Sequence, residues 1–276
     1  MDWNDIVKAA KIANAPTDGD YTENGILFCG KCRTPKQTTA KNPFTGAEQI
    51  VGCLCSCRQA SIEQERKKRA QEANRQYLIK AFGGHEKPLS YVFGENLTDA
   101  QKMCLNYCKN FDEFFKSGTG LLLYGTLGSG KTHTACSVAN ELFRTRGTSF
   151  IMTSVIELAE ASMSSSQNGW LWDRMSDDDL VIIDDLGTEG TSDWRREIMY
   201  RAINGRIMSG KPMIITTNMS LEDFKNPADY GMRRLTDRVI QVCLPIKMEG
   251  VNYRRKEVRE NYKENMRKLL DNSETV

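Results

Sequence analysis

One glycine-rich segment constrains the fold of this chain more than any other feature. Residues 125–132 read Gly-Thr-Leu-Gly-Ser-Gly-Lys-Thr, which matches the phosphate-loop pattern G-x-x-x-x-G-K-[ST] without a gap. An apolar stretch, Gly120–Tyr124, precedes the segment, and a helical pattern runs from Thr132 to Arg144. The order strand, glycine loop, helix predicts the first unit of a parallel α/β sheet, in which the loop binds phosphate.

Each residue type in this loop has a physical role in binding a nucleotide. Glycines let backbone N–H groups curl around phosphate oxygens, and the N-terminus of the following helix adds favourable partial charge. Lys131 would reach the β and γ phosphates, and the Thr132 hydroxyl would hold Mg²⁺. The residues expected to bind ATP in and beside the loop are Gly125, Gly128, Ser129, Gly130, Lys131, Thr132 and His133.

Two further strand ends carry polar residues suited to the same chemistry. The stretch Leu180–Asp185 is an apolar strand that delivers two adjacent carboxylates. Asp184 fits the acid associated with Mg²⁺, and Asp185 fits the group that orients or deprotonates the attacking water. Such a pair can instead cap a helix, but its place downstream of a phosphate loop favours the nucleotide interpretation. Asn218 follows the apolar strand Pro212–Thr217, and in a parallel sheet its amide would lie beside the phosphates and position the water.

Strands and helices alternate through the rest of this region. Beside the elements named above, we expect strands over Ser149–Thr153 and Val239–Leu244 and helices over Ser154–Met163 and Asp193–Ser209. Alternation of this kind predicts an α/β fold in which helices flank a parallel sheet.

The nine cysteines fall into two groups. Four stand among apolar neighbours and are expected to be small buried hydrophobic residues: Cys104, Cys108, Cys136 and Cys243. The other five are Cys29 and Cys32, followed about twenty residues later by Cys53, Cys55 and Cys57, and they have the spacing of a tetrahedral thiolate zinc site. We expect Zn²⁺ on Cys29, Cys32, Cys55 and Cys57, because Cys53 would then continue the preceding strand. Cys53 paired with Cys55 or with Cys57, and thiols without a metal, are the alternatives.

Length and charge frame the domain organisation. A chain of 276 residues is long enough for about two domains. We expect a zinc-binding module over residues 1–60, with turns and a short hairpin between the cysteine pairs, a charged helical linker over 61–87 and an α/β domain over 88–276. Lys+Arg 38 against Asp+Glu 36 leaves a formal charge of +2, so any contact with DNA has to come from local patches.

The sequence also bears on location. No apolar run approaches the roughly 18 residues that a membrane helix needs, and the start MDWNDIVKAA lacks the basic and then apolar pattern of a secretory signal. We therefore expect a cytoplasmic protein with no membrane partner. A secreted protein held by disulfides is disfavoured, and a reducing cytosol favours zinc over disulfides at the cysteine pairs.

These motifs together resemble those of AAA+ ATPases of the DnaC/DnaI-type helicase loader group. The most specific part of the resemblance is IIDDLGTEGTSDW followed by INGRIMSGKPMIITTN, which is close to the sequences of that group around its second and third motifs. The resemblance implies that Asp184 and Asp185 form the Walker B pair and that Asn218 is sensor 1. It also implies an arginine finger at Arg238, which would complete the site of a neighbouring subunit, and a sensor 2 residue at Arg254.

The resemblance further implies a function. Loaders of this group bind the hexameric replicative DNA helicase with a small N-terminal module and bind single-stranded DNA with an ATPase part that self-associates into a spiral. Here the zinc module would bind the helicase, and Trp170 and Trp172 would be candidates for stacking on bases. The first alternative is an IstB-like transposition helper ATPase, which shares the core motifs but does not usually carry the cysteine module. The second is a zinc-bearing adaptor with a static nucleotide site.

The second acid of the Walker B pair departs from a common AAA+ pattern. Many AAA+ proteins have Asp-Glu where this chain has Asp184 and Asp185, although Asp-Asp occurs within the loader group. The shorter side chain holds its carboxylate one methylene further from the water. We therefore expect slow, switch-like hydrolysis of ATP to ADP and phosphate, stimulated by a partner.

Overall fold

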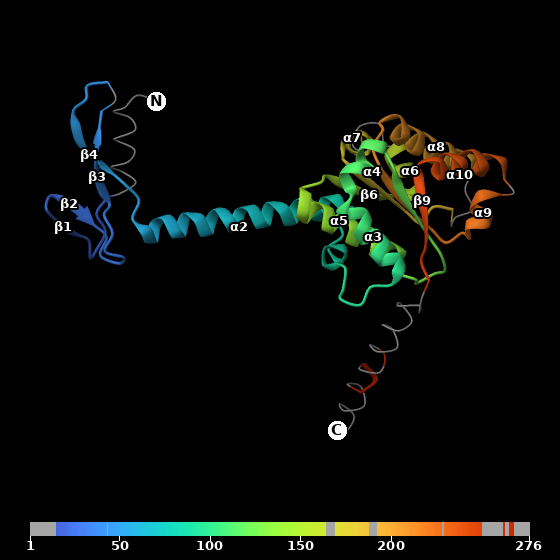
Figure 1. Ribbon diagram of the computed structural model, residues 1–276, viewed down its shortest axis with the longest axis horizontal. Helices are drawn as coiled ribbons and strands as arrows, with labels where there is room; N and C mark the ends of the chain where they lie inside the picture. Colours follow the sequence, from blue (N-terminus) through green and yellow to red (C-terminus); the bar gives the residue numbers. More distant parts are fainter. Residues whose placement is uncertain are drawn as a thin grey trace. The chain divides into compact units, whose positions relative to one another are not determined.

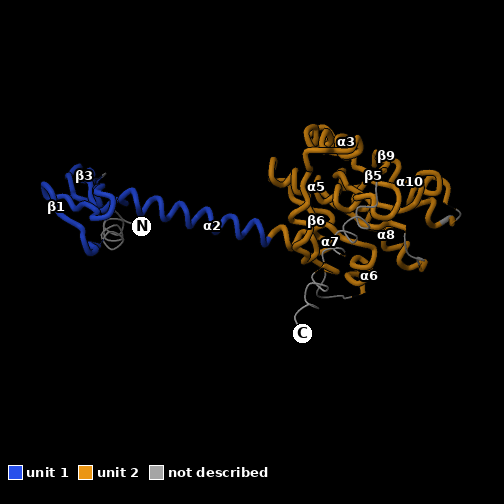
Figure 2. Tube along the Cα trace, turned by 90° about the horizontal axis from the view of Figure 1, so that it is seen from below, with its two compact units in different colours: residues 1–76 blue, residues 77–276 orange. Residues whose placement is uncertain are grey.

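A computed structural model describes residues 15–42, 44–163, 169–187, 192–227, 229–249, 262 and 265–267 of the chain. The chain divides into two compact units, Met1–Gln76 and Tyr77–Val276, which Figure 2 distinguishes by colour. Within the ranges given above, no helix is both long enough and apolar enough to cross a membrane.

Two β-hairpins make up most of the described strand structure of the first unit. Strands β1 (Tyr21–Glu23) and β2 (Ile26–Phe28) pair across an Asn-Gly turn, and both turn residues have the positive φ that a tight hairpin requires. Strands β3 (Gln37–Lys41) and β4 (Glu48–Gly52) pair in the interval between the two cysteine groups. The hairpin expected in that interval is therefore present, and it ends one residue before Cys53.

The helix α2 (Ser56–Ala81) has 26 residues and a polar surface. It contains most of the segment 61–87 that the sequence predicts as a linker, and the boundary between the two units falls inside it. Glu63 and Lys67, one turn apart, form one of the exposed ion pairs along this helix. The last residue of α2, Ala81, is buried. A helix with this composition has no apolar face to pack along most of its length.

A five-stranded parallel sheet forms the centre of the second unit (Figure 1). Its strands lie in the order β6-β7-β8-β5-β9, and every neighbouring pair is parallel. The bounds of the strands are β5 Gly120–Tyr124, β6 Phe150–Ser154, β7 Leu180–Asp184, β8 Met213–Thr217 and β9 Cys243–Lys247. The predicted α/β fold with a parallel sheet is confirmed.

Helices cover both faces of this sheet, and each face has its own buried apolar core. Leu121 and Leu123 of β5 belong to the core shared with α3 and α5, while Leu122 belongs to the core shared with α6, α8 and α10, as the alternation of side chains along a strand requires. The helices of this unit, besides the end of α2, are η1 (Lys87–Ser90), α3 (Asp99–Lys109), α4 (Phe111–Ser117), α5 (Lys131–Arg146), α6 (Val155–Met163), α7 (Gly169–Asp177), α8 (Asp193–Met208), α9 (Leu221–Lys225) and α10 (Tyr230–Val242).

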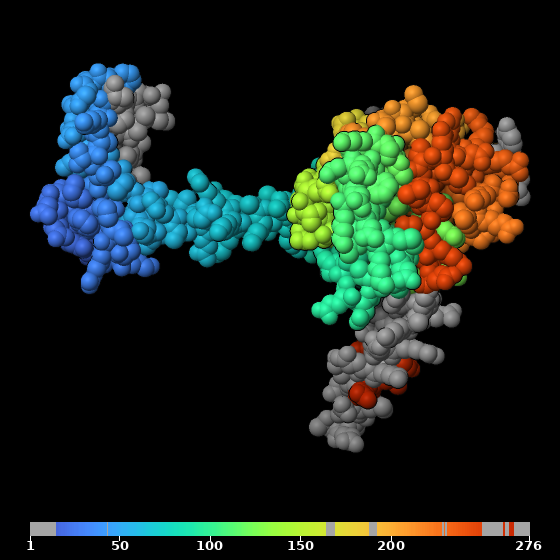
Figure 3. Space-filling view, viewed as in Figure 1, coloured from blue at the N-terminus to red at the C-terminus, as the bar shows by residue number. Residues whose placement is uncertain are grey.

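The last strand begins later than the sequence predicts. The prediction of a strand over Val239–Leu244 is wrong for its first four residues, because α10 continues to Val242 and β9 begins at Cys243. Leu235 and Val239, four residues apart on one face of α10, are both buried, so helix packing overrides the local β preference of a β-branched residue. Strand β9 forms one edge of the sheet, and Figure 3 shows it at the surface beside α3.

Candidate functional site

The loop between β5 and α5 has the backbone that a phosphate cradle needs. Gly125 has a φ of 145°, and a Cβ on it would lie 2.4 Å from the carbonyl oxygen of Met248, so a side chain does not fit. Gly130 has a φ of 89°, in the left-handed region, immediately before the first residue of α5. The glycines therefore allow the tight turn that leads into the N-terminus of α5, where the helix dipole favours an anion.

Lys131 joins this loop to the end of β8. Its side chain is buried, and Nζ donates hydrogen bonds to the carbonyl oxygens of Gly125 and Thr126, each at 2.9 Å, and to Oδ1 of Asn218 at 2.7 Å. Because β5 and β8 are parallel neighbours, the loop after one and the asparagine after the other meet at the same edge of the sheet. The predicted sensor 1 residue thus contacts the lysine that is predicted to reach the β and γ phosphates.

The two aspartates lie at the same edge, at the end of β7. The Thr132 hydroxyl lies 3.0 and 3.2 Å from the two carboxylate oxygens of Asp184 and donates to them. The Asn218 amide donates to Oδ1 of Asp185 at 3.1 Å. Residues that come from three separate sequence motifs therefore lie within hydrogen-bonding distance of one another.

A residue of β8 to which the sequence analysis assigned no role belongs to this group as well. The Thr216 hydroxyl donates to Oδ1 of Asp184 at 2.6 Å and accepts from the backbone N–H of Asp185 at 2.9 Å. The parallel register pairs Ile183 with Ile215, which brings the next residue of β8 beside the next residue of β7. Strand register was thus the signal that could have identified Thr216.

The donor set fits a nucleotide and Mg²⁺. The Ser129 hydroxyl, inside the loop, is buried and has no hydrogen-bond partner in the part of the chain that the structure describes, as expected of a donor to phosphate. Oxygen ligands such as the Thr132 hydroxyl and the Asp184 carboxylate are those that Mg²⁺ prefers. When bound, Mg²⁺ would neutralise charge on the phosphate oxygens. The Asp185 carboxylate beside the Asn218 amide can orient a water molecule and accept its proton.

Two further residues are predicted to bind the nucleotide, His133 and Arg254. The ring of His133 packs against that of Tyr91, with 4.5 Å between the ring centroids, and burial lowers the pKa of His133 below its ordinary value of 6.5. Asn140 donates to the carbonyl oxygens of Pro88 and Tyr91 and so fixes this segment on α5. His133 therefore lies beside an aromatic side chain that the sequence analysis did not single out. Arg254 lies outside the described residues.

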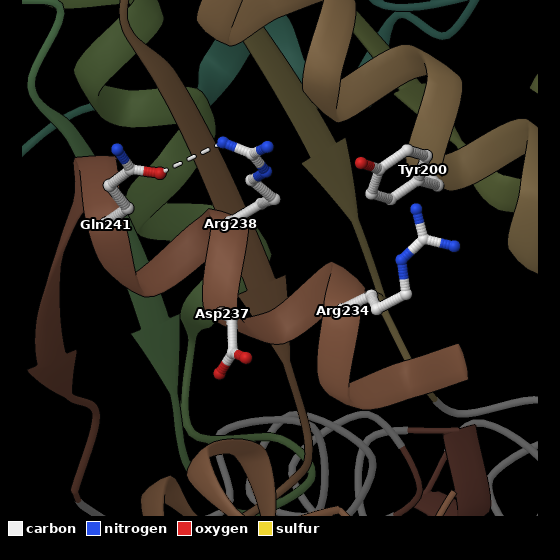
Figure 4. Close-up of a pocket in the computed structure, with 5 residues that line it drawn as sticks. All are labelled: Tyr200, Arg234, Asp237, Arg238 and Gln241. Carbon is white, nitrogen blue, oxygen red and sulfur yellow. Dashed lines mark hydrogen bonds between the residues drawn. The ribbon is translucent and has the colours of Figure 1, made fainter. Parts of the chain in front are cut away.

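The predicted arginine finger lies in a pocket beside α10. The pocket has a volume of about 380 Å³ and is lined by Tyr200, Arg234, Asp237, Arg238 and Gln241 (Figure 4). Arg238 donates to Oε1 of Gln241 at 3.4 Å, and the Arg234 guanidinium lies 4.7 Å from the centroid of the Tyr200 ring. Figure 4 shows both guanidinium groups on the same side of α10, with Asp237 pointing away from them. The pocket therefore offers positive charge to a ligand.

Four cysteine sulfurs converge in the first unit. The sulfur atoms of Cys29, Cys32, Cys55 and Cys57 all lie within 4.8 Å of one another. The sulfur of Cys57 is 3.6 Å from that of Cys29 and 3.4 Å from that of Cys55. A tetrahedral site with Zn–S bonds of about 2.3 Å separates its sulfurs by about 3.8 Å. Cys53 lies outside this group, and its thiol donates to a backbone carbonyl oxygen. The structure thus brings together the four thiols that were expected to bind zinc when Cys53 is assigned to the end of the preceding strand.

The thiol pKa values show how strongly these groups interact. The Thr34 hydroxyl and backbone N–H groups lower the pKa of Cys32 to about 5, whereas the neighbouring thiols raise the pKa of Cys57 to about 12. Opposite shifts of this kind mean that the cluster does not hold all its thiolates at neutral pH without a cation among them. Zn²⁺ would supply that charge and takes thiolate ligands, so the cluster fits a structural zinc ion.

An acidic residue that the sequence analysis missed holds the first cysteine pair in place. The Asp20 carboxylate accepts from the backbone N–H of Gly30, between Cys29 and Cys32, at 3.0 Å. It also accepts from Nζ of Lys36 at 2.6 Å, and both side chains are almost completely buried. The ion pair and the backbone donors hold the pKa of Asp20 far below its ordinary range. An aspartate in a polar turn carries no sequence signal that would distinguish this contact.

Fold and site together define the class of protein. One parallel sheet carries a phosphate loop after β5, paired aspartates at the end of β7 and an asparagine after β8. The crystal structure of DnaI aligns with this chain at a TM-score of 0.52 and 23% identity, covering 62% of this chain and 94% of that one. The second unit therefore has the fold of an AAA+ domain.

Comparison with known sequences identifies the family. Residues 46–261 match the family model described as IstB-like ATP binding protein, and the chain belongs to this family. The replicative helicase loader DnaI of Bacillus subtilis (strain 168) is 26% identical over 208 residues, which cover 68% of this chain and 66% of that protein. The replicative helicase loader DnaC of Escherichia coli (strain K12) is 26% identical over 131 residues, which cover 45% of this chain and 53% of that protein. The chain thus spans about two thirds and about half of these relatives, and the predicted membership of the DnaC/DnaI-type AAA+ group is confirmed.

Proposed function

We propose that this protein is an ATP-dependent loader of a hexameric replicative DNA helicase. In this proposal the first unit binds the helicase, and the second unit binds ATP and single-stranded DNA. The observation that carries it is the convergence of Lys131, Asp185 and Asn218 at one edge of the sheet, in a chain whose relatives are named replicative helicase loaders. A nucleotide site alone suits many functions, and the named relatives together with a separate cysteine cluster favour a loader.

ATP hydrolysis in this proposal is slow and depends on a partner. Asp185, oriented by Asn218, would activate the water, and its side chain is one methylene shorter than the glutamate common in AAA+ proteins. Arg238 would complete the site of a neighbouring copy, because a cationic pocket beside α10 suits an anionic phosphate. Such a finger acts when protomers stack, so the proposal includes self-association into a spiral.

Single-stranded DNA would contact the second unit beside α7. Trp170 keeps 40% of its surface exposed, and Nζ of Lys80 lies 5.4 Å from the centroid of its ring. An exposed aromatic ring next to a positive charge can stack on a base while the charge attracts the backbone. Trp172 packs against the buried core instead, with the Arg201 guanidinium 5.5 Å from its ring centroid, so it supports the proposal less.

A zinc ion in the first unit would fold the surface that binds the helicase. The described part of this unit before α2 is two short hairpins with few buried side chains. A structural zinc site contributes roughly 10–16 kcal/mol to folding modules of this size. The Cys29, Cys32, Cys55 and Cys57 thiols would hold it.

The second candidate function is that of a transposition helper ATPase. It is favoured by the family description, which names IstB-like proteins. The same AAA+ site would serve it, but it gives no role to the cysteine cluster. Binding to a hexameric helicase is therefore the observation that separates the two.

Co-purification tests the proposal. The full-length chain is mixed with bacterial replicative helicases, with and without ATP, and helicase loading onto a single-stranded circle is then assayed. We expect the wild type to bind, Cys55→Ser to abolish binding and Cys53→Ser to retain it, because only the first is a predicted zinc ligand. Lys131→Ala should keep helicase binding but lose loading, whereas Lys116→Ala, an exposed lysine on α4, should keep both.

Two outcomes would overturn the proposal. If no hexameric helicase is retained in either nucleotide state, the loader function is wrong and the transposition helper is favoured. If Lys131→Ala loads helicase as well as the wild type does, the nucleotide site is a static structural element and the protein is an adaptor.

A further inference from the structure

The side chain of Thr216 stands where the two acids of the ATP site meet. It is completely buried at the end of β8. Its hydroxyl donates to Oδ1 of Asp184 at 2.6 Å and accepts from the backbone N–H of Asp185 at 2.9 Å. One hydroxyl therefore contacts the side chain of the first acid and the backbone of the second.

The backbone of Asp185 needs to be held. Its φ of 56° lies in the left-handed region, which costs most L-residues roughly 1–2 kcal/mol and persists where surrounding contacts over-determine it. The bond from its N–H to Thr216 is one such contact, and the bond from the Asn218 amide to its carboxylate is another. The direction in which the Asp185 carboxylate leaves the chain depends on both.

The Asp184 carboxylate is held in the same way from two sides. The Thr132 hydroxyl of the P-loop helix and the Thr216 hydroxyl both donate to it. Since Thr132 and Asp184 are the oxygen ligands that would hold Mg²⁺, the orientation of Asp184 decides whether both can reach one ion.

We propose that Thr216 is a positioning residue of the ATP site. It directs Asp184 toward Thr132 and fixes the left-handed turn that presents Asp185 to Asn218. The inference rests on the proposed ATPase function and names a residue through which β8 acts on that site. Its contacts are with protein groups, so its effect reaches the nucleotide through the two acids.

The neighbouring residue provides a matched control. Thr217 is equally buried, and its hydroxyl also makes two hydrogen bonds, donating to the carbonyl oxygen of Leu186 at 2.6 Å and accepting from the N–H of Met219 at 3.2 Å. Successive side chains of a strand point to opposite faces of the sheet, so the Thr217 hydroxyl does not share the face of Asp184. A Thr217→Val substitution therefore removes comparable contacts without touching either carboxylate.

The experiment compares the full-length wild type with Thr216→Val, Thr216→Ser and Thr217→Val. Two quantities are measured: steady-state ATP hydrolysis, and the affinity for a fluorescent ATP analogue in EDTA and in excess Mg²⁺. We expect Thr216→Val to lower kcat at least about tenfold, because positioning a general base is worth roughly 10²–10⁴ in rate, and to raise the KM for MgATP in proportion to the loss of Mg²⁺-dependent affinity. Its affinity in EDTA should stay within about twofold of the wild type, while the gain on adding Mg²⁺ shrinks at least about fivefold. Thr216→Ser should restore both values, and Thr217→Val should leave both within about twofold.

Several results would overturn the inference. Equal losses in Thr216→Val and Thr217→Val, or no recovery in Thr216→Ser, would make Thr216 a structural residue only. If the wild type hydrolyses no ATP, with or without single-stranded DNA, the hydrolysis in the proposed function fails, and the Mg²⁺-dependent affinity of the same four proteins still decides the role of Thr216. If thermal unfolding shows that Thr216→Val does not fold, Thr216→Cys takes its place, because it keeps most of the side-chain volume with a weak donor.

Discussion

The buried guanidinium of Arg206 offers the sharpest test of how the second unit is held together. Arg206 lies in α8, is 1% exposed and makes five hydrogen bonds to four carbonyl oxygens. These oxygens belong to Met175 and Asp178, near the end of α7, to Asp179, just before β7, and to Pro212, just before β8. One side chain therefore ties together the segments that lead into the two strands carrying Asp184 and Thr216, and burial lowers its own pKa to about 10.

We expect Arg206→Met to lower the free energy of unfolding of this unit by about 3–5 kcal/mol. Each buried carbonyl oxygen that loses its donor costs about 1–3 kcal/mol, and at least three of the four lie outside regular helix or strand. The gain from no longer burying a charged group offsets part of that loss. For a unit of this size, about 3–5 kcal/mol lowers Tm by roughly 6–20 °C.

Urea unfolding followed by tryptophan fluorescence measures this effect, because Trp170, Trp172 and Trp194 all report on the second unit. The matched control is Arg201→Met, which makes the same chemical change on the same helix at an exposed position and should cost no more than about 1 kcal/mol. The reasoning is refuted if the two variants lose the same stability, or if Arg206→Met unfolds within about 1 kcal/mol of the wild type.

Three further predictions concern the two sites. Cys55→Ser should abolish the binding of one zinc ion per chain, whereas Cys53→Ser should retain it, and atomic absorption measures the bound zinc. A zinc chelator should remove the strand signal of the first unit in circular dichroism without changing the melting temperature of the second unit. Asp185→Asn should lower the rate of ATP hydrolysis, measured by phosphate release, at least about 100-fold. Its nucleotide affinity, measured by titration, should stay within about twofold of the wild type. A parallel loss of rate and affinity would contradict the role of Asp185 as a base. Because burial lowers the pKa of His133 below 6.5, the unfolded chain binds a proton that the folded chain does not, so the free energy of unfolding falls as the pH drops below about 6.5. His133→Gln should make this decline shallower in urea titrations between about pH 5 and 8, and an unchanged slope would count against the shift.

The parts of the site that the sequence predicts are those tied to local backbone geometry or to sheet topology. Gly125 and Gly130 adopt positive φ, which few residue types other than glycine do, so the P-loop can be recognised from the sequence alone. Asp184 and Asn218 come at or just after the ends of apolar strands, and parallel strands bring such ends to one edge. The pattern therefore predicts which strand ends meet, without any knowledge of side-chain contacts.

The sequence does not predict contacts between side chains that are far apart in the chain and meet only through packing. The bond between Lys131 and Asn218 joins residues 87 positions apart, and Asp20 reaches Gly30 and Lys36 across a turn. Arginine is almost never fully buried, so no sequence pattern indicates that the guanidinium of Arg206 is enclosed by carbonyl oxygens. In α10 the burial of one helical face decides between helix and strand, and that burial depends on the rest of the fold.

The left-handed backbone at Asp185 has a consequence for how this protein can change over generations. Short polar residues such as aspartate and asparagine enter that conformation several times more often than other residues, and a glutamate there would be strained. Conversion to the Asp-Glu pair of many AAA+ proteins would therefore add strain of roughly 1–2 kcal/mol unless a second change relaxes the turn after β7. A single-codon replacement would lengthen the side chain and at the same time disturb the turn that aims it. Homologues that keep this turn are therefore expected to keep aspartate at its start.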